Sequence, residues 1–235
     1  MLEKQICAWT ILLAAGCAAL TAADQPWKDK LIAQWSAEEA RQVLTESPWA
    51  KTVTPELAAA SAGGGQQQAG IGLGGMGIGM SRRGGRRGAG RAPDDSGSAD
   101  AGPPPTLTLR WASAMPVIAA ELIAREANAP SVDENRYAIA VYGLPGRMIH
   151  GDPRKLGAEL KKRAAIKREG KRDMRPSSVE VLMHDEGPVI LYLFPRSAEI
   201  ARRDSQLEFD AEIGRLKLAP VFLPEEMVYQ GKLEL

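Results

Sequence analysis

A stretch without hydrophobic periodicity divides this chain of 235 residues into two parts. It runs from Glu56 to Pro105 and consists mainly of Ala, Gly, Gln and Arg, followed by the sequence PDDSGSADAGPPP. Such a composition cannot bury enough apolar surface to offset the conformational entropy that folding costs. We therefore expect 56–105 to be a disordered linker, whose ends lie roughly 40 Å apart on average if the chain is flexible. The folded part must come from the segments on either side.

The N-terminus has the pattern of an export signal. Lys4 supplies a short basic region, and Ile11 to Leu20 form an apolar core that is short for a membrane span. The small residues Thr21, Ala22 and Ala23 follow and suit signal peptidase cleavage. We expect 1–23 to be a signal peptide and the mature chain to reach the periplasm or cell envelope. The alternative is a buried N-terminal helix.

Cys17 adds a second processing route. The sequence LAAGC, which ends at Cys17, resembles a bacterial lipoprotein box, in which the cysteine is lipidated. Cleavage near Ala23 would instead remove Cys7 and Cys17, and the mature chain would then have no cysteine for disulfides, thiol catalysis or zinc. Both routes remain open, and membrane attachment is expected only if Cys17 is lipidated or the signal is not cleaved.

Residues 24–55 form a short helical segment rich in tryptophan. Ser36 followed by Glu39 fits a capping box, so a helix is predicted over 37–45, ending before Pro48. Three tryptophans carry too much apolar surface to remain in water: Trp27, Trp35 and Trp49. We expect the segment to dock on the main domain, with a partner-binding peptide as the alternative.

Residues 106–235 regain periodicity and predict one α+β domain. The first half gives a β-α-β-α order, with strands at 106–111 and 136–144, and helices at 114–127 and from Asp152 on. In the first helix we expect Val117, Ile118, Leu122 and Ile123 to share one face. The rest alternates between apolar and polar residues, includes a hairpin signal around 184–187, and predicts an antiparallel meander packed on the helices.

Several segments together resemble a known group of proteins. These are DQPWKDKLIAQWSAEEA, SPWAKTV, the Gly/Arg-rich insert, YAIAVYGLP, SSVEVL, LFPRS and the ending MVYQGKLEL. The combination is similar to an uncharacterised family of exported bacterial proteins of acidobacterial type, over nearly the whole mature chain. The resemblance implies export and no activity, cofactor or catalytic residue.

Nucleotide chemistry has little support. Residues 72–77, GLGGMG, match G-x-G-x-x-G formally. That motif works only where it joins a strand to a helix whose N-terminus meets the pyrophosphate, and no such elements flank it here. The P-loop sequence is absent, and no cofactor is expected.

Two histidines limit the hydrolytic chemistry that the chain could perform. His150 lies near Asp152, and His184 lies beside Asp185 at the expected hairpin turn. Each histidine has two interpretations. It is a residue of a surface loop without a chemical role, or it acts as a general base or as a single metal ligand. Without G-x-S-x-G, S-x-x-K or cysteine partners, neither a hydrolase nor a zinc site is favoured, and no metal is expected.

Basic residues cluster in two places although the formal net charge is only +1. The insert contains five arginines without acids: Arg82, Arg83, Arg86, Arg87 and Arg91. It lacks the aromatic residues that stack on bases, so no nucleic-acid partner is expected. The stretch 154–175 holds ten Lys or Arg, and its Lys161 and Lys162 suit a helix C-terminus. Each cluster has two interpretations. It is a solvated surface, or it is a binding site for an anionic partner.

These observations favour an exported, non-catalytic, envelope-associated binding or scaffolding protein. Its partner would be an envelope protein or an anionic polymer. The alternative is a secreted hydrolase that uses His150 or His184 with a nearby carboxylate.

Overall fold

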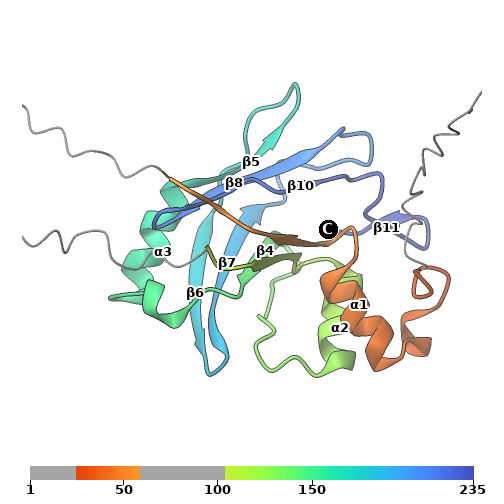
Figure 1. Cartoon of the computed structure of the whole chain (residues 1–235). Helices are drawn as coiled ribbons and strands as arrows, with labels where there is room; N and C mark the ends of the chain where they lie inside the picture. Colours follow the sequence, from red (N-terminus) through yellow and green to blue (C-terminus); the bar gives the residue numbers. More distant parts are fainter. Residues whose placement is uncertain (1–24, 59–103) are drawn as a thin grey trace, which may run out of the picture.

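The computed structural model describes residues 25–58 and 104–235 (Figure 1). The expected signal peptide, Cys17, the five insert arginines and most of the expected linker lie outside the described residues. In the described part, no helix combines the length and the apolar character needed to cross a membrane.

The fold belongs to the α+β class and contains two antiparallel sheets (Figure 1). Sheet A has the order β1 (Ala50–Val53), β3 (Leu107–Trp111), β4 (Arg136–Tyr142), β7 (Gly187–Pro195), β6 (Ser178–His184). Sheet B has the order β10 (Val221–Phe222), β8 (Leu207–Ile213), β9 (Leu216–Leu218), β2 (Glu56–Leu57), and β5 (Ala164–Arg168) also pairs with β8. A small separate hairpin joins β11 (Val228–Tyr229) to β12 (Lys232–Leu233).

Three α-helices and two short 3-10 helices complete the described fold: η1 (Ile32–Gln34), α1 (Ala37–Thr45), α2 (Met115–Ala124), η2 (Gly146–Met148) and α3 (Pro153–Lys162). In Figure 1, α1 and α2 lie together at the lower right, and α3 lies at the left beside β6. The helix predicted over 37–45 is confirmed. Its capping box is formed, because Glu39 N donates to Ser36 Oγ at 3.2 Å and Ser36 N donates to Glu39 Oε2 at 2.8 Å.

The core lies between the two sheets. Strand β8 alternates as its sequence predicts, and its apolar side chains Leu207, Phe209, Ala211 and Ile213 are buried. Aromatic rings meet across the layers: Tyr192 and Phe209 have centroids 5.0 Å apart, and Trp111 and Phe222 have centroids 5.5 Å apart. This edge-to-face packing joins sheet A to sheet B.

The Trp-rich segment forms part of this same core. Trp27 and Trp49 are fully buried, Trp35 is 6% exposed, and the Trp27 and Trp49 rings are 5.6 Å apart. Strand β1 adds an edge to sheet A by pairing with β3, and β2 adds an edge to sheet B by pairing with β9. Residues 25–58 therefore extend both sheets, and the folded region continues past the expected linker boundary at Glu56.

Two further expectations differ from the structure. The last strands do not form one meander, because the β6–β7 hairpin joins sheet A beside β4 while β8, β9 and β10 belong to sheet B. The face predicted for the helix at 114–127 is also wrong. Val117 is buried, but Ile118 and Leu122 are exposed, and the buried side is completed by Pro116, Ala120 and Glu121.

Gly157 sets how closely α3 approaches sheet A. A Cβ atom at this position would lie 2.4 Å from the backbone oxygen of Val179 in β6. Gly157→Ala should therefore lower the free energy of unfolding by about 1–3 kcal/mol, although alanine favours helices more than glycine does. Urea unfolding would measure this. Gly146→Ala is the control, because a Cβ there meets nothing within 4 Å, and a Gly157→Ala protein as stable as this control would contradict the prediction.

Candidate functional site

Helix α3 is oriented by its two ends and by its apolar side. Asp152 caps the N-terminus by accepting a hydrogen bond from Arg154 N at 2.8 Å, and Pro153 occupies the first turn, where a missing N–H costs nothing. Leu160 and Gly157 are buried against the fold, and Leu156 is half-buried. The opposite side of the helix therefore faces solvent.

That solvent-facing side is basic. It carries four exposed cations: Arg154, Lys155, Lys161 and Lys162. None of the four forms an ion pair within 25–58 or 104–235. Glu159 is the acidic residue that α3 contains. We name these four residues the α3 basic face.

The basic surface continues beyond the C-terminus of α3. Arg175 Nη1 donates to the backbone oxygen of Lys162 at 3.3 Å, which fixes the guanidinium beside the helix end. An open hollow of about 460 Å³ lies next to it, lined by Arg172, Asp173 and Arg175. The α3 basic face thus borders a depression with two arginines and one carboxylate.

Other cations of the stretch 154–175 are already paired with acids of the fold. Lys167 Nζ lies 2.5 Å from Asp210 Oδ2 and 3.0 Å from Glu208 Oε1, and these hydrogen bonds raise the pKa of Lys167. Lys171 Nζ lies 2.5 Å from Asp204 Oδ1. These lysines hold β5 and its following loop to β8 and the loop before it.

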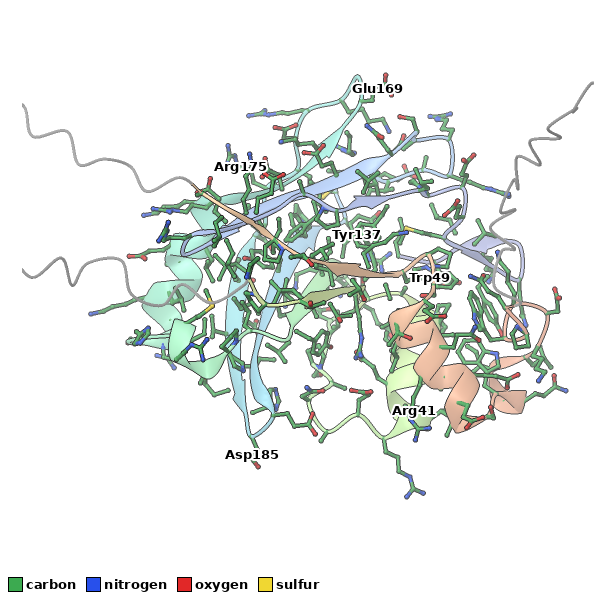
Figure 2. All side chains as sticks on the ribbon, in the orientation of Figure 1. Arg41, Trp49, Tyr137, Glu169, Arg175 and Asp185 are labelled. Atoms are coloured by element: carbon green, nitrogen blue, oxygen red, sulfur yellow. The ribbon has the colours of Figure 1, made fainter. Side chains whose placement is uncertain are left out.

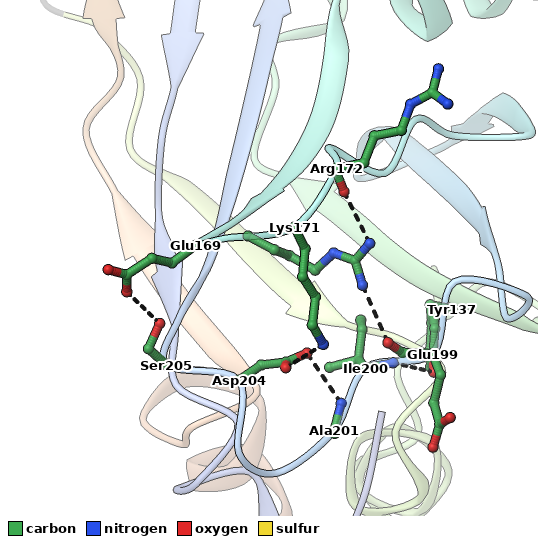
Figure 3. Close-up of polar contacts among 10 residues, drawn as sticks. Tyr137, Glu169, Lys171, Arg172, Glu199, Ile200, Ala201, Asp204 and Ser205 are labelled. Carbon is green, nitrogen blue, oxygen red and sulfur yellow. Dashed lines mark hydrogen bonds and ion pairs between the residues drawn. The ribbon is translucent and has the colours of Figure 1, made fainter.

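Figure 3 shows how that loop is fixed. Arg168 donates to the backbone oxygens of Glu199 at 3.2 Å and Arg172 at 3.0 Å, and Ser205 Oγ donates to Glu169 at 2.7 Å. These contacts use Arg168 for structure. The basic residues of this stretch look alike in sequence, but the fold uses Lys167, Arg168 and Lys171 around β5 for structure and leaves the α3 basic face free of ion pairs within the described residues.

The two histidines do not meet a catalytic partner in the described part of the chain. His150 is exposed in the loop before α3. His184 ends β6, is half-buried, and its Nε2 has no hydrogen-bond partner. Asp185 lies in the exposed hairpin turn and points outward at its tip (Figure 2). Neither imidazole is hydrogen-bonded to a carboxylate or hydroxyl, so the geometry gives the hydrolase hypothesis no support.

The geometry of the described residues does not support a metal site either. Within 25–58 and 104–235, no three or more His, Cys, Asp or Glu side chains gather closely enough to hold a metal ion. Cys17 and the insert arginines lie outside the described residues, and their proposed roles stay predictions.

A buried polar cluster was missed by the sequence interpretation. Arg110 on β3 donates from Nε to the backbone oxygen of Leu44 at 3.0 Å, and its guanidinium carbon lies 4.4 Å from the centre of the Tyr142 ring. Tyr142 OH donates to Glu121 Oε1 at 2.9 Å, and Arg110 Nη1 is 3.5 Å from the same oxygen. A signal was present, because Glu121 interrupts an otherwise apolar helix and Arg110 occupies a strand rich in apolar residues.

This cluster is enclosed and joins α1, α2 and sheet A. Glu121 is 4% exposed, and burial raises its pKa to about 7 against the lowering effects of Tyr142 and Arg110. Burial, together with the neighbouring Glu121, also raises the pKa of Tyr142. Because its side chains contact α1, α2 and sheet A, the cluster is a structural element of the fold.

Comparison with protein-family models, with curated proteins and with solved structures found no match to this chain.

Proposed function

We propose that this chain is an exported, non-catalytic, envelope-associated protein that binds an anionic polymer through the α3 basic face. One observation carries the proposal: the four cations on that face are exposed and form no ion pair with any residue that the structure describes, while neighbouring cations are used within the fold. Export is inferred from the signal pattern of 1–23 and from the resemblance to exported proteins of acidobacterial type.

The spacing of the charges supports a polymer as the ligand. A helix rises by about 1.5 Å per residue, so the eight steps from Arg154 to Lys162 span about 12 Å. This is close to the screening length of about 8–10 Å at physiological salt, so the fields of the four cations overlap. A row of overlapping positive fields attracts a chain of repeated negative groups better than it attracts a single small anion.

The chemistry of the face also narrows the polymer class. No aromatic side chain lies on α3, so bases would find no stacking platform there. Arginine and lysine contacts instead suit phosphate, sulfate or carboxylate groups along a backbone. An acidic envelope polymer fits these requirements.

Removing the four charges should weaken binding to a polyanion. The variant Arg154→Gln/Lys155→Gln/Lys161→Gln/Lys162→Gln should bind fluorescein-labelled heparin at least about tenfold more weakly at low salt, because a tenfold change needs only about 1.4 kcal/mol. The wild-type advantage should shrink as salt is added, because exposed charges are screened. Fluorescence anisotropy with the chain from Asp24 on would measure both effects.

A matched control separates the face from the net charge. Lys28→Gln/Arg41→Gln/Arg215→Gln/Lys232→Gln removes the same number of charges at exposed positions outside α3. Arg41, for example, lies on the other side of the molecule from α3 in Figure 2. The control should bind nearly as well as wild type. Equal losses in both variants would mean that only net charge matters, and the proposed site would be rejected.

A further inference from the structure

Helix α2 exposes an apolar stripe that the described residues leave uncovered. Met115 is 53% exposed, Ile118 is 44% exposed and Leu122 is 79% exposed. Their spacing places all three on one side of the helix, opposite the side that packs on the fold. Apart from Glu121, α2 is apolar on its exposed side as well as on its buried side. A helix of this composition is normally buried on both sides, so the exposed stripe indicates an interface.

One half of the stripe borders a hollow. Met115 and Ile118 form one wall of a groove of about 200 Å³, and Val132 and Leu233 contribute apolar surface to it. This volume is small for a cofactor or small-molecule site. It is better suited to a single side chain of another protein. Leu122, the most exposed side chain of the stripe, projects from the other half of the helix.

The charges at the two ends of the stripe are opposite. Arg125 is the C-cap of α2 in the left-handed backbone conformation, stands three residues after Leu122 in the sequence, and is exposed. Glu134 lines the groove beside Met115 and is also exposed. Within the described chain, neither Arg125 nor Glu134 forms an ion pair. One surface thus carries a projecting leucine with a cation at one end and a hollow with a carboxylate at the other.

We propose that a second copy of this chain covers the stripe, with α2 packed antiparallel on α2 of the other copy. A two-fold axis near Ile118 places Leu122 of each copy opposite Met115 and the groove of the other. It also brings Arg125 of each copy to Glu134 of the other. Self-complementarity of this kind is what a two-fold symmetric interface requires, because each contact occurs twice.

A lipid surface fits the same stripe less well. The groove is lined by three acidic residues, Asp133, Glu134 and Glu234, and by one cation, Arg196, so its net charge is negative and repels anionic headgroups. The dimer is independent of the α3 basic face, so variants of that face should leave it intact. One helix pair is smaller than a standard stable interface, so we expect dissociation in the micromolar range.

Substitutions in the stripe test the apolar contact. Sedimentation velocity of the chain from Asp24 on, up to about 100 µM, should show a monomer–dimer equilibrium. Leu122→Glu should raise the dissociation constant at least about tenfold, because it places a carboxylate against Met115 and beside the acidic residues of the groove. Met183→Glu changes another side chain that is 57% exposed, on β6, and should leave the equilibrium unchanged. A wild-type chain that stays monomeric over this range, or floats with anionic vesicles through Leu122, would overturn the dimer.

Charge reversal tests the geometry. Arg125→Glu alone and Glu134→Arg alone should each weaken the dimer, because two repulsive pairs replace two attractive ones. A 1:1 mixture of the two variants should restore it, because each remaining pair then has opposite signs. Circular dichroism would show that both variants are folded. If the mixture stays as monomeric as either variant alone, Arg125 does not face Glu134 across a two-fold axis and the proposal fails.

Discussion

Trp49→Ala is expected to lower the free energy of unfolding by about 3–5 kcal/mol, a large part of the 5–15 kcal/mol that typical domains possess. The Trp49 side chain is fully buried and packs on Trp27, whose ring lies 5.6 Å away. Its indole N–H donates to the backbone oxygen of Glu234 at 2.7 Å, which joins the N-terminal segment to the last residues of the chain. Removing it leaves a cavity and an unpaired carbonyl. Urea unfolding followed by far-UV circular dichroism would measure the loss.

Trp49→Phe separates the ring from the hydrogen bond. Phenylalanine keeps most of the apolar contact but cannot donate to Glu234, so the expected loss is smaller than for alanine by about 2 kcal/mol. A loss of less than about 1 kcal/mol of unfolding free energy in Trp49→Ala would contradict the prediction, since the removal of a large side chain from the core between the two sheets destabilises a protein by more than this. Such a result would favour the alternative, in which the segment serves as a peptide for another protein.

The elements predicted from the sequence are those that local interactions determine. The helix that begins after Ser36 has its capping partner only three residues away, and the hairpin at 184–187 has two strands that are adjacent in sequence. The position of 50–57 has no local signal. Ala50 pairs with Arg110 and Glu56 pairs with Lys217, so only contacts distant in the sequence make this segment an edge of both sheets.

In the candidate site, too, the sequence predicts what local patterns determine and misses what depends on contacts distant in the sequence. Lys161 and Lys162 were predicted to bind an anionic partner, and they lie exposed on α3. The sequence could not separate them from Lys167 and Lys171, because the acids that pair with these two come from β8 and the loop before it. Likewise, Ile118 and Leu122 looked like core residues, since periodicity shows that a helix has an apolar side but not which of two apolar sides meets the fold.

The buried cluster around Glu121 should make stability depend on pH. Its carboxyl pKa is raised from 4.5 to about 7, chiefly because the side chain is buried. Between these values the unfolded chain has an ionised Glu121 and the folded chain a neutral one. The unfolded state therefore binds fewer protons, and the free energy of unfolding falls as pH rises. The stabilisation is complete below about pH 4.5 and is lost as pH passes about 7.

Glu121→Gln should abolish this part of the pH dependence. Glutamine is neutral at every pH, and its side-chain oxygen can still accept the hydrogen bond from Tyr142. A pKa shift of one unit corresponds to about 1.4 kcal/mol, so the free energy of unfolding of wild type should fall relative to the variant by about 3 kcal/mol between pH 4 and pH 8. Urea unfolding of both proteins at several pH values would measure the difference, in which the other titrating groups cancel.

The groups that face Glu121 determine whether this effect is seen in full. Arg110 and the Tyr142 hydroxyl favour its charged form, while Glu126, 3.6 Å from Arg110 Nη1, competes for the same cation and disfavours it. Arg110 also retains the Leu44 carbonyl and the Tyr142 ring when Glu121 is neutral, so its charge is not left without partners. Glu226→Gln, at an exposed position, is the control and should keep the wild-type slope. If Glu121→Gln also kept that slope, Arg110 would be holding Glu121 ionised throughout, and the cluster would be a permanent ion pair.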